Sequence, residues 1–171
     1  MINRPKPDEY SEYAGRYVNL VGNGPILDIL ERQKEESYNL FKSLSAEKAA
    51  YAYADDKWTI KQIIGHMADT ERVFAYRALV FSRESITLPG FDQDVYMEQA
   101  TFNSRPLEDL ANELKTVRES SLYLFRSLTE QQSTQKGIAS GSPFSVRAFA
   151  YMIAGHELHH IKILKERYLV D

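Results

Sequence analysis

The chain has 171 residues, of which 43% are hydrophobic and 26% are charged, which is the balance of an ordinary globular protein of one domain. Its formal net charge is −3, and its 21 Lys and Arg residues are scattered among 24 acids, so no nucleic-acid partner is expected. The absence of cysteine excludes disulfides, thiolate catalysis and cysteine-bound metal sites, so any metal ion must be held by His, Asp or Glu.

Residues 1–20 are predicted to form an irregular N-terminal arm, because its start is polar and contains two prolines. Tyr10, Tyr13 and Tyr17 would let this arm lay aromatic rings on the body of the protein. The start has no apolar segment of the signal-peptide type, and no stretch approaches the roughly 18 apolar residues that a membrane span needs. We therefore expect a cytoplasmic protein without a membrane partner.

Two helices are predicted in the first half of the chain. Asn23-Gly24-Pro25 is typical of a helix start, and helical spacing of apolar residues extends from there to about Leu44. Residues 45–57 are predicted to form a loop with room for one helical turn. Thr59 followed by Gln62 matches the capping box, which predicts a second helix from this point to about Ser82.

The second half of the chain predicts two more helices and no strand. Residues 85–104 form a long connection, in which 92–99 can make a short helix. Ser104 is predicted to cap a third helix that has Pro106 near its start and ends near Leu128, and residues 129–144, rich in Gly, Ser and Gln, form the last loop. Ser145 is predicted to cap a fourth helix that reaches Tyr168.

These elements predict an all-α fold. Residues 1–171 would make a single domain, in which residues 25–169 form a four-helix bundle behind the arm of residues 1–20. The longest connection would lie between helices two and three. A connection of this length is usually functional or crosses the bundle.

The histidines are concentrated in two places. His66 lies in the second predicted helix, and His156, His159 and His160 lie close together in the fourth. At about 100° per residue, His156 and His160 lie on one face, about one turn apart, whereas His159 lies on the flank. Because His66 and His156 both lie away from helix ends, and bundle cores often hold metal sites, the sequence predicts one metal ion on His66, His156 and His160.

The type of ligand limits the metal ion and its coordination. Three imidazoles favour zinc, nickel, copper or ferrous iron over magnesium or calcium. Three protein ligands also leave positions open for water or a substrate, as in a catalytic zinc site.

Two other motifs overlap the fourth helix. His156-Glu157-Leu158-His159-His160 matches the H-E-x-x-H motif of zinc proteases, in which Glu157 would be the general base. Ile163 and Glu166 stand where the extended motif needs Gly and His, and little chain remains for a distant third ligand, so a protease is disfavoured. Glu157 and His160 also form one E-x-x-H pair of the di-iron pattern, but the sequence has no second pair.

The chain resembles the DinB-like metal-binding proteins from about Ile26 to Leu169. The resemblance rests on short motifs in a fixed order: Trp58-Thr59-Ile60, Ile63-Ile64-Gly65-His66-Met67-Ala68-Asp69, Leu88-Pro89-Gly90-Phe91-Asp92, and Gly155-His156 with His159-His160. It implies a four-helix bundle, often dimeric, whose His triad binds nickel or zinc. The family's helix-two His corresponds to His66, and its final H-x-x-x-H pair corresponds to His156 and His160.

The resemblance also implies a class of activity, because the family includes bacillithiol S-transferases and, more distantly, mycothiol-dependent maleylpyruvate isomerases. We expect a homodimeric, metal-dependent transferase that acts on a small-molecule substrate with a low-molecular-weight thiol, although no residue here identifies the thiol. The alternatives are a metal-dependent hydrolase with a metal-bound hydroxide and a non-catalytic metal-binding stress-response protein. A pocket able to hold a thiol-sized ligand beside the metal favours the two enzymes, whereas a metal sealed by aromatic side chains, with no open position, favours the third. Phe91 and Tyr96 could wall such a pocket, but a loop packed on a bundle would use them the same way. Trp58 is expected to staple the helix entry.

Asp69 lies three residues after His66 and could orient a metal ligand by forming a hydrogen bond with it. The alternative is an ordinary helix acid that is solvated or pairs with Arg72 or Arg77. Both interpretations stay open at this point.

Glu157 and His159 are also open to two interpretations. Glu157 could act as a base or orient a ligand, or it could form a salt bridge with Lys162 or Lys165. His159 could form a hydrogen bond across the bundle, or it could simply border the site.

Overall fold

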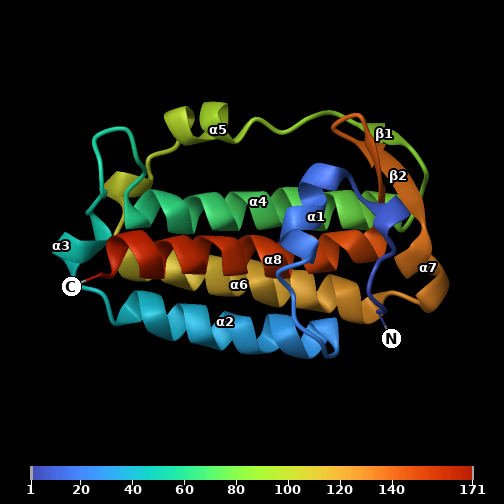
Figure 1. Cartoon of the computed structure of the whole chain (residues 1–171), viewed down its shortest axis with the longest axis horizontal. Coiled ribbons are helices and arrows are strands. Elements are labelled where there is room, and N and C mark those ends of the chain that lie inside the picture. The colour runs from blue at the N-terminus through green and yellow to red at the C-terminus, as the bar shows by residue number, and fades with distance from the viewer. Residues whose placement is uncertain (1, 171) are drawn as a thin grey trace.

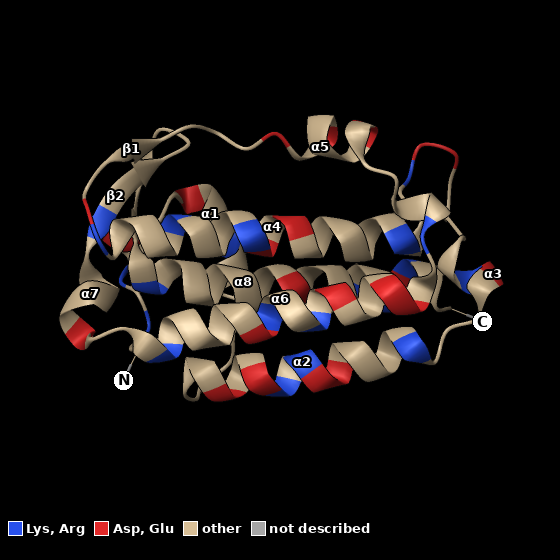
Figure 2. Cartoon of the chain, turned by 180° about the vertical axis from the view of Figure 1, so that it is seen from behind, with Lys and Arg blue, Asp and Glu red and all other residues tan. Residues whose placement is uncertain are grey.

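The computed structural model describes residues 2–170, and four long helices packed side by side form the body of the protein (Figure 1). They are α2 (Ile26–Lys42), α4 (Ile60–Phe81), α6 (Leu107–Ser127) and α8 (Val146–Ile163). Charged residues of both signs follow the outer sides of α2 and α6 (Figure 2). This arrangement confirms the predicted four-helix bundle. None of the described helices is long and apolar enough to cross a membrane.

Side-chain caps explain where α4 and α8 begin. The Thr59 hydroxyl accepts a hydrogen bond from the Gln62 N–H at 3.2 Å, and the Gln62 side chain accepts one from the Thr59 N–H at 2.9 Å. Ser145 caps α8 by accepting from the Ala148 N–H at 3.2 Å. Both predicted starts are confirmed, because in each case the cap satisfies backbone donors that the first helical turn leaves free.

One predicted helix start needs correction, and one predicted helix end is confirmed with a different last turn. The third helix begins after Pro106 rather than at Ser104, which lies in the 3-10 turn η2 (Phe102–Ser104). Pro106 is the N-cap, with a non-helical ψ of 143°, and a proline disfavours helix in the residue before it, here Arg105. The fourth helix does reach Tyr168, but its last turn is a π-helix, η3 (Leu164–Tyr168).

The long connection exists because α4 and α6 are neighbours that run in the same direction. Lys61 near the start of α4 donates to the Asn103 carbonyl just ahead of α6, and Arg118 of α6 binds Glu71 of α4 further along. The chain must therefore return about 33 Å, the length of α4, before α6 can begin. It does so with β1 (Thr87–Leu88) and α5 (Gln93–Gln99), which pass over α4 in Figure 1. The short helix predicted here is confirmed, as is a helical turn in the earlier loop, α3 (Ala46–Ala49).

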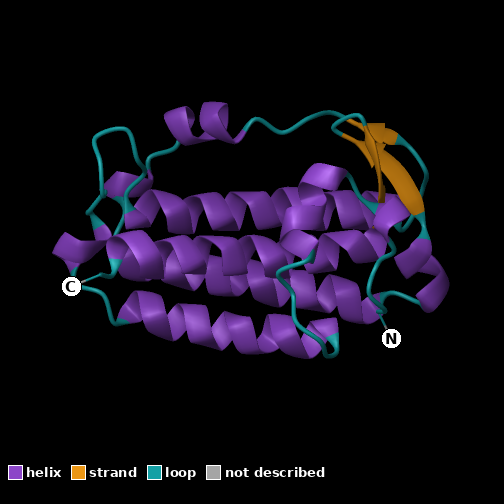
Figure 3. Ribbon diagram, in the orientation of Figure 1, coloured by secondary structure: helices purple, strands orange, loops and turns teal. Residues whose placement is uncertain are grey.

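A small sheet lies at one end of the bundle (Figure 3), where the sequence predicted only a loop over residues 129–144. The structure has α7 (Glu130–Thr134) followed by a hairpin of β2 (Lys136–Ala139) and β3 (Ser142–Ser145), and β1 pairs with β2 in parallel. Ser140 and Gly141 form the tight turn with φ of 51° and 76°, the backbone that closes two-residue hairpins. The strands are too short to give an alternating pattern, which is why the sequence does not reveal them.

The N-terminal arm is more ordered than predicted. It contains a 3-10 turn, η1 (Pro7–Glu9), and a helix, α1 (Glu12–Val18), which Ser11 caps by accepting from the Ala14 N–H at 3.2 Å. Helix α1 lies across α8 in Figure 1, with Ala14 and Val18 buried against the bundle. The prediction of an irregular arm is therefore wrong. The sequence does not reveal α1, because a helix of two turns is too short to show periodicity.

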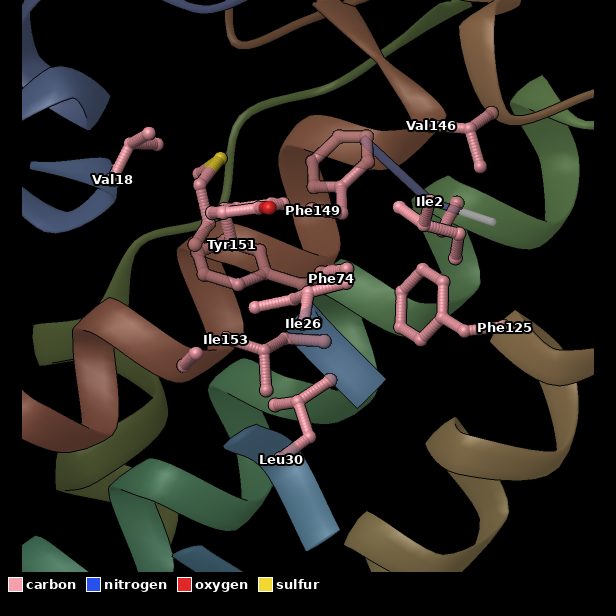
Figure 4. Packing of buried hydrophobic residues seen from close by; sticks show 14 of the residues in the cluster. Ile2, Val18, Ile26, Leu30, Phe74, Phe125, Val146, Phe149, Tyr151 and Ile153 are labelled. Atoms are coloured by element: carbon pink, nitrogen blue, oxygen red, sulfur yellow. The ribbon is translucent and has the colours of Figure 1, made fainter. Parts of the chain in front are cut away.

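The apolar core has two parts. Figure 4 shows the part nearer the sheet, where Phe74 of α4 and Phe149 of α8 pack with Ile26 and Leu30 of α2. The second part, which includes Phe41, fills the other end of the bundle. On α8, His156 and His160 lie between the residues of the two parts, and on α4 His66 lies among residues of the second part.

Candidate metal centre

Three of the four histidines meet inside the bundle. His66 of α4 and His160 of α8 each place Nε2 at 3.1 Å from Nε2 of His156. One ligand atom from each of the three lies within 4.8 Å of the others, and all three residues are buried. The structure thus brings together the three residues that the sequence predicts as metal ligands and leaves His159 at the edge.

The distances from His156 Nε2 to the other two Nε2 atoms fit a transition-metal ion. Imidazole nitrogens bound to zinc at about 2.0–2.1 Å, at tetrahedral to right angles, lie about 2.9–3.4 Å apart. The observed 3.1 Å falls inside this range. An all-imidazole donor set also suits zinc, nickel or copper better than magnesium or calcium.

Burial keeps these imidazoles neutral. It lowers the pKa of His66 to about 4 and, with help from the neighbouring histidines, lowers the pKa of His160 to about 3. Burial and the other two members of the triad hold the pKa of His156 well below its usual range. The three side chains therefore present free lone pairs at neutral pH, as metal binding requires.

Side chains around the triad hold its rings in place. The Trp58 ring lies with its centroid 4.9 Å from that of His66, and the Thr70 hydroxyl lies 3.5 Å from His66 Nδ1. The Tyr17 ring meets His156 edge-on at 5.4 Å between centroids. The staple by Trp58 at the entry to α4 stays a prediction, whereas its ring does pack against a member of the triad.

Glu157 is turned away from the triad and belongs to a buried ion-pair network. Arg118 donates to Glu157 at 2.5 Å and also binds Glu71 through two nitrogens at 2.8 and 2.9 Å. The hydroxyl of Ser37 donates to the other Glu157 oxygen at 2.5 Å. The predicted salt bridge with Lys162 or Lys165 is wrong, and Glu157 is not placed to act as the general base of a zinc protease.

Asp69 and His159 lie outside the triad. Asp69 pairs with Arg72 at 3.2 Å, which matches the ordinary interpretation of this acid, and burial raises its pKa. The His159 ring packs edge-on against Tyr17 and His160, with centroids 5.5 and 5.1 Å away. His159 therefore borders the site.

A cavity of about 310 Å³ lies on one side of the triad and reaches His156. Helices α1, α4 and α8, the hairpin and the long connection all contribute to its wall. Phe91 of the connection lines it, and Tyr96 packs edge-on against Phe91 with centroids 4.7 Å apart.

A second cavity of about 290 Å³ reaches His160 and is bordered by Trp58 and Tyr168. The hydroxyl of Tyr168 donates to the Trp58 carbonyl at 2.7 Å, which ties the end of α8 to the start of α4. The triad therefore has open space on two sides and is not sealed by aromatic side chains.

Sequence reasoning missed two residues of the first cavity, Thr70 and Arg77. Both lie on α4 on the same face as His66 and Phe74, at steps of four, four and three residues. That spacing was visible in the sequence. The local sequence suggests Arg77 only as a partner for an acid, because the cavity beside it is closed by the connection and the hairpin, which are distant in the sequence.

Comparison with known proteins agrees with this fold and places the chain in a family. The chain is 30% identical over 125 residues, 72% of each protein, to "Putative metal-dependent hydrolase OB0413" of Oceanobacillus iheyensis. It is 24% identical over 163 residues to "Putative metal-dependent hydrolase OB0782" of the same organism, covering 94% of this chain and 93% of that protein.

A solved structure and a family profile match as well. The structure is YfiT from Bacillus subtilis, described as "a probable metal-dependent hydrolase with an unusual four-helix bundle topology". It superposes with a TM-score of 0.75 at 17% identity, covering 96% of this chain and 90% of YfiT. The profile of the DinB superfamily matches residues 29–164, and the chain therefore belongs to the DinB superfamily.

Proposed function

We propose that this chain is a metal-dependent enzyme that binds one divalent transition metal ion, zinc or nickel, through His66, His156 and His160. The observation that carries the proposal is the convergence of three neutral, buried imidazoles beside an open cavity. An ion bound there would act as a Lewis acid and lower the pKa of a water or thiol that it binds. The chain itself keeps the imidazoles unprotonated and packs Trp58 and Tyr17 against their rings.

Hydrolysis of a small molecule is the reaction we favour. The names of the two Oceanobacillus iheyensis relatives support it, as does the description of YfiT. The cavity beside His156 offers room for a substrate next to the proposed ion. A non-catalytic metal-binding protein has no need of such space, and the two cavities therefore count against that alternative.

Transfer that involves a low-molecular-weight thiol is a second candidate, which one observation favours. Among residues 2–170, no carboxylate forms a hydrogen bond or ion pair with the triad, and Arg118 engages Glu157. Metal-dependent proteases use a carboxylate as general base toward water. A thiol needs only to lose its own proton, which a bound metal ion promotes.

One set of assays separates the two reactions. Protein loaded with zinc or nickel is tested with chromogenic esters and amides, and separately with an electrophile plus bacillithiol, each with and without a chelator. Chelator-sensitive cleavage without thiol supports hydrolysis, and chelator-sensitive conjugation supports thiol transfer. Failure of both reactions across the panel would contradict the enzymatic proposal.

Replacing any one of the three histidines tests the metal site directly. Loss of a residue that forms a hydrogen bond with a metal ligand already lowers metal affinity by about 10- to 100-fold. Loss of a ligand itself is therefore expected to lower it by more than about 100-fold. His66→Ala, His156→Ala and His160→Ala are titrated with zinc against a chromogenic chelator, and the metal content is measured by mass spectrometry.

His159→Ala is the matched control, because His159 borders the triad without joining it. It is expected to keep the affinity of the unmodified chain. Equal zinc affinity in all four variants would rule out the triad as the metal site. The homodimer stays a prediction, which light scattering of the purified protein checks.

A further inference from the structure

Arg77 carries a buried positive charge that no acid among residues 2–170 compensates. Its side chain is 6% exposed, and Nη2 donates to the Pro89 carbonyl at 2.9 Å and to the Ser140 hydroxyl at 3.3 Å. Within residues 2–170, no carboxylate lies within 4.0 Å of its guanidinium. The other deeply buried guanidinium, that of Arg118, is bound by both Glu71 and Glu157.

This contrast is energetically important. A buried charge is costly unless it is paired, and a guanidinium has five N–H donors in a fixed fork. The two neutral acceptors that Arg77 does have occupy a single nitrogen, Nη2. Burial accordingly lowers the pKa of Arg77, and no neighbouring acid offsets the effect. The side chain is therefore prepared to bind an anion that this chain does not supply.

Arg77 lines the same cavity as His156. Eleven residues separate His66 from Arg77 on α4, which corresponds to about 16 Å along the helix axis. The cavity follows this face of α4, past Thr70 and Phe74, from the triad toward the hairpin. Its volume of about 310 Å³ holds roughly ten water molecules at about 30 Å³ each.

We propose that Arg77 binds the carboxylate of a small, elongated substrate whose reacting group lies at the histidine triad. The inference rests on the proposed function and extends it by naming a class of substrate. Arginine matches a carboxylate through two parallel hydrogen bonds, which fixes both the position and the direction of the ligand. The middle of the substrate would lie along the apolar wall of Phe74, Phe91 and Phe144.

The charge of the cavity favours a carboxylate over a phosphate. Arg77 is the one Lys or Arg among the described residues that line it, and the other polar lining residues apart from His156 are neutral hydroxyl and amide side chains. A single guanidinium balances one negative charge. A phosphate group carries about −1.5 to −2 at neutral pH and would leave charge uncompensated at this end of the cavity.

The first test needs no substitution. Binding of 3-phenylpropionate and of its neutral isostere 3-phenylpropionamide is measured by calorimetry on the metal-free and on the zinc-loaded protein. Because a hydrogen bond to a charged group contributes about 1.5–3 kcal/mol, the acid is expected to bind at least about 10-fold more tightly than the amide in both forms. Equal affinities in the metal-free protein would overturn the inference.

Substitutions then assign the preference to Arg77. Arg77→Gln is expected to bring the ratio of acid to amide affinity close to one, and Arg77→Lys is expected to keep part of it. Arg83→Gln, an exposed arginine just beyond the same helix, is the matched control and should keep the full ratio. An unchanged ratio in a folded Arg77→Gln protein would contradict the inference, and tighter binding of phenyl phosphate than of the acid would contradict the carboxylate assignment.

The outcome is separable from that of the metal proposal. Zinc affinity is measured on the same Arg77 variants and is expected to stay unchanged, because Arg77 lies about three helical turns from His66. Loss of the acid preference in Arg77→Gln with normal zinc affinity supports the anion site alone. Unchanged zinc affinity in the histidine variants would overturn the metal site. The comparison of acid and amide binding in metal-free protein would still test the anion site at Arg77.

Discussion

At the scale of single residues, burial decides the chemistry of the histidines. The triad is buried inside the bundle, where a charged imidazole would lose its hydration. His66, His156 and His160 are therefore neutral when the protein is folded, even in mildly acidic solution. The same lone pairs are then free for a metal ion, and protons compete for them poorly.

The stability of the metal-free protein is expected to fall between pH 7.5 and pH 5. In the unfolded chain a histidine has a pKa near 6.5, whereas folding lowers that of His66 to about 4 and that of His160 to about 3. Below pH 6.5 the unfolded chain therefore binds protons that the folded protein does not. At pH 5 the loss is on the order of 2 kcal/mol for each such histidine. Urea unfolding at the two pH values measures it.

A suitable control for this pH dependence is His66→Gln, which should show a smaller loss because one titrating group has been removed. Buried carboxylates affect stability at lower pH. Arg147 holds the pKa of Glu9 at about 2, so the contribution of Glu9 to the free energy of unfolding is lost only below pH 4.5. A free energy of unfolding that is the same at pH 7.5 and pH 5 would contradict the expectation.

At the scale of elements, a glycine lets α1 lie directly on α8. A Cβ at Gly155 would come within 2.0 Å of the Tyr17 carbonyl oxygen, so only glycine permits this approach of the two backbones. The contact sets Tyr17 against His156, whose ring it meets edge-on. The short helix that the sequence does not reveal is thereby part of the wall of the site.

Gly155→Ala is expected to destabilise the protein by about 1–3 kcal/mol, because α1 must move away from α8 to make room. The same shift would move Tyr17 from His156. Thermal unfolding and near-ultraviolet circular dichroism measure the two effects. Gly22→Ala is the control, since a Cβ there meets no atom within 4 Å. Equal stability of the two variants would mean that the approach of α1 is not tight in solution.

At the scale of the whole molecule, one arginine connects all four helices of the bundle. Arg118 of α6 binds Glu71 of α4 and Glu157 of α8, and it donates to the Leu30 carbonyl of α2 at 3.2 Å. Burial alone would lower the pKa of Arg118, but the Glu157 and Glu71 carboxylates outweigh burial and raise it. The network holds α4 and α8, the two helices that carry the triad, in a fixed relation.

Arg118→Met is expected to destabilise the protein by about 3–5 kcal/mol, because it leaves two buried carboxylates without their partner. Arg126→Met, which removes an exposed pair with Glu31, is expected to cost at most about 1 kcal/mol. Urea unfolding of both variants at neutral pH measures the difference. Similar losses in the two would show that the buried network contributes no more than a surface ion pair.

How much of the fold the sequence reveals depends on the length of each element. Helices α4 and α8 extend over several turns and begin at side-chain caps, so periodicity and capping predict them together. Helix α1 and the hairpin around Ser140 are too short for either signal. Their stability comes from burial against the bundle, a tertiary effect that the local sequence does not record.

The sequence alone determined that His156 and His160 share a helix face, by covalent spacing, and the capping box places His66 well inside its own helix. Only the packing of α4 against α8 brought His66 to the other two. Only the tertiary structure decided the surroundings. It paired Glu157 with Arg118, placed Trp58 and Tyr17 against the imidazoles and closed a cavity between His156 and Arg77. The reason is physical: spacing along one helix is local, whereas partners and cavities arise where distant segments pack.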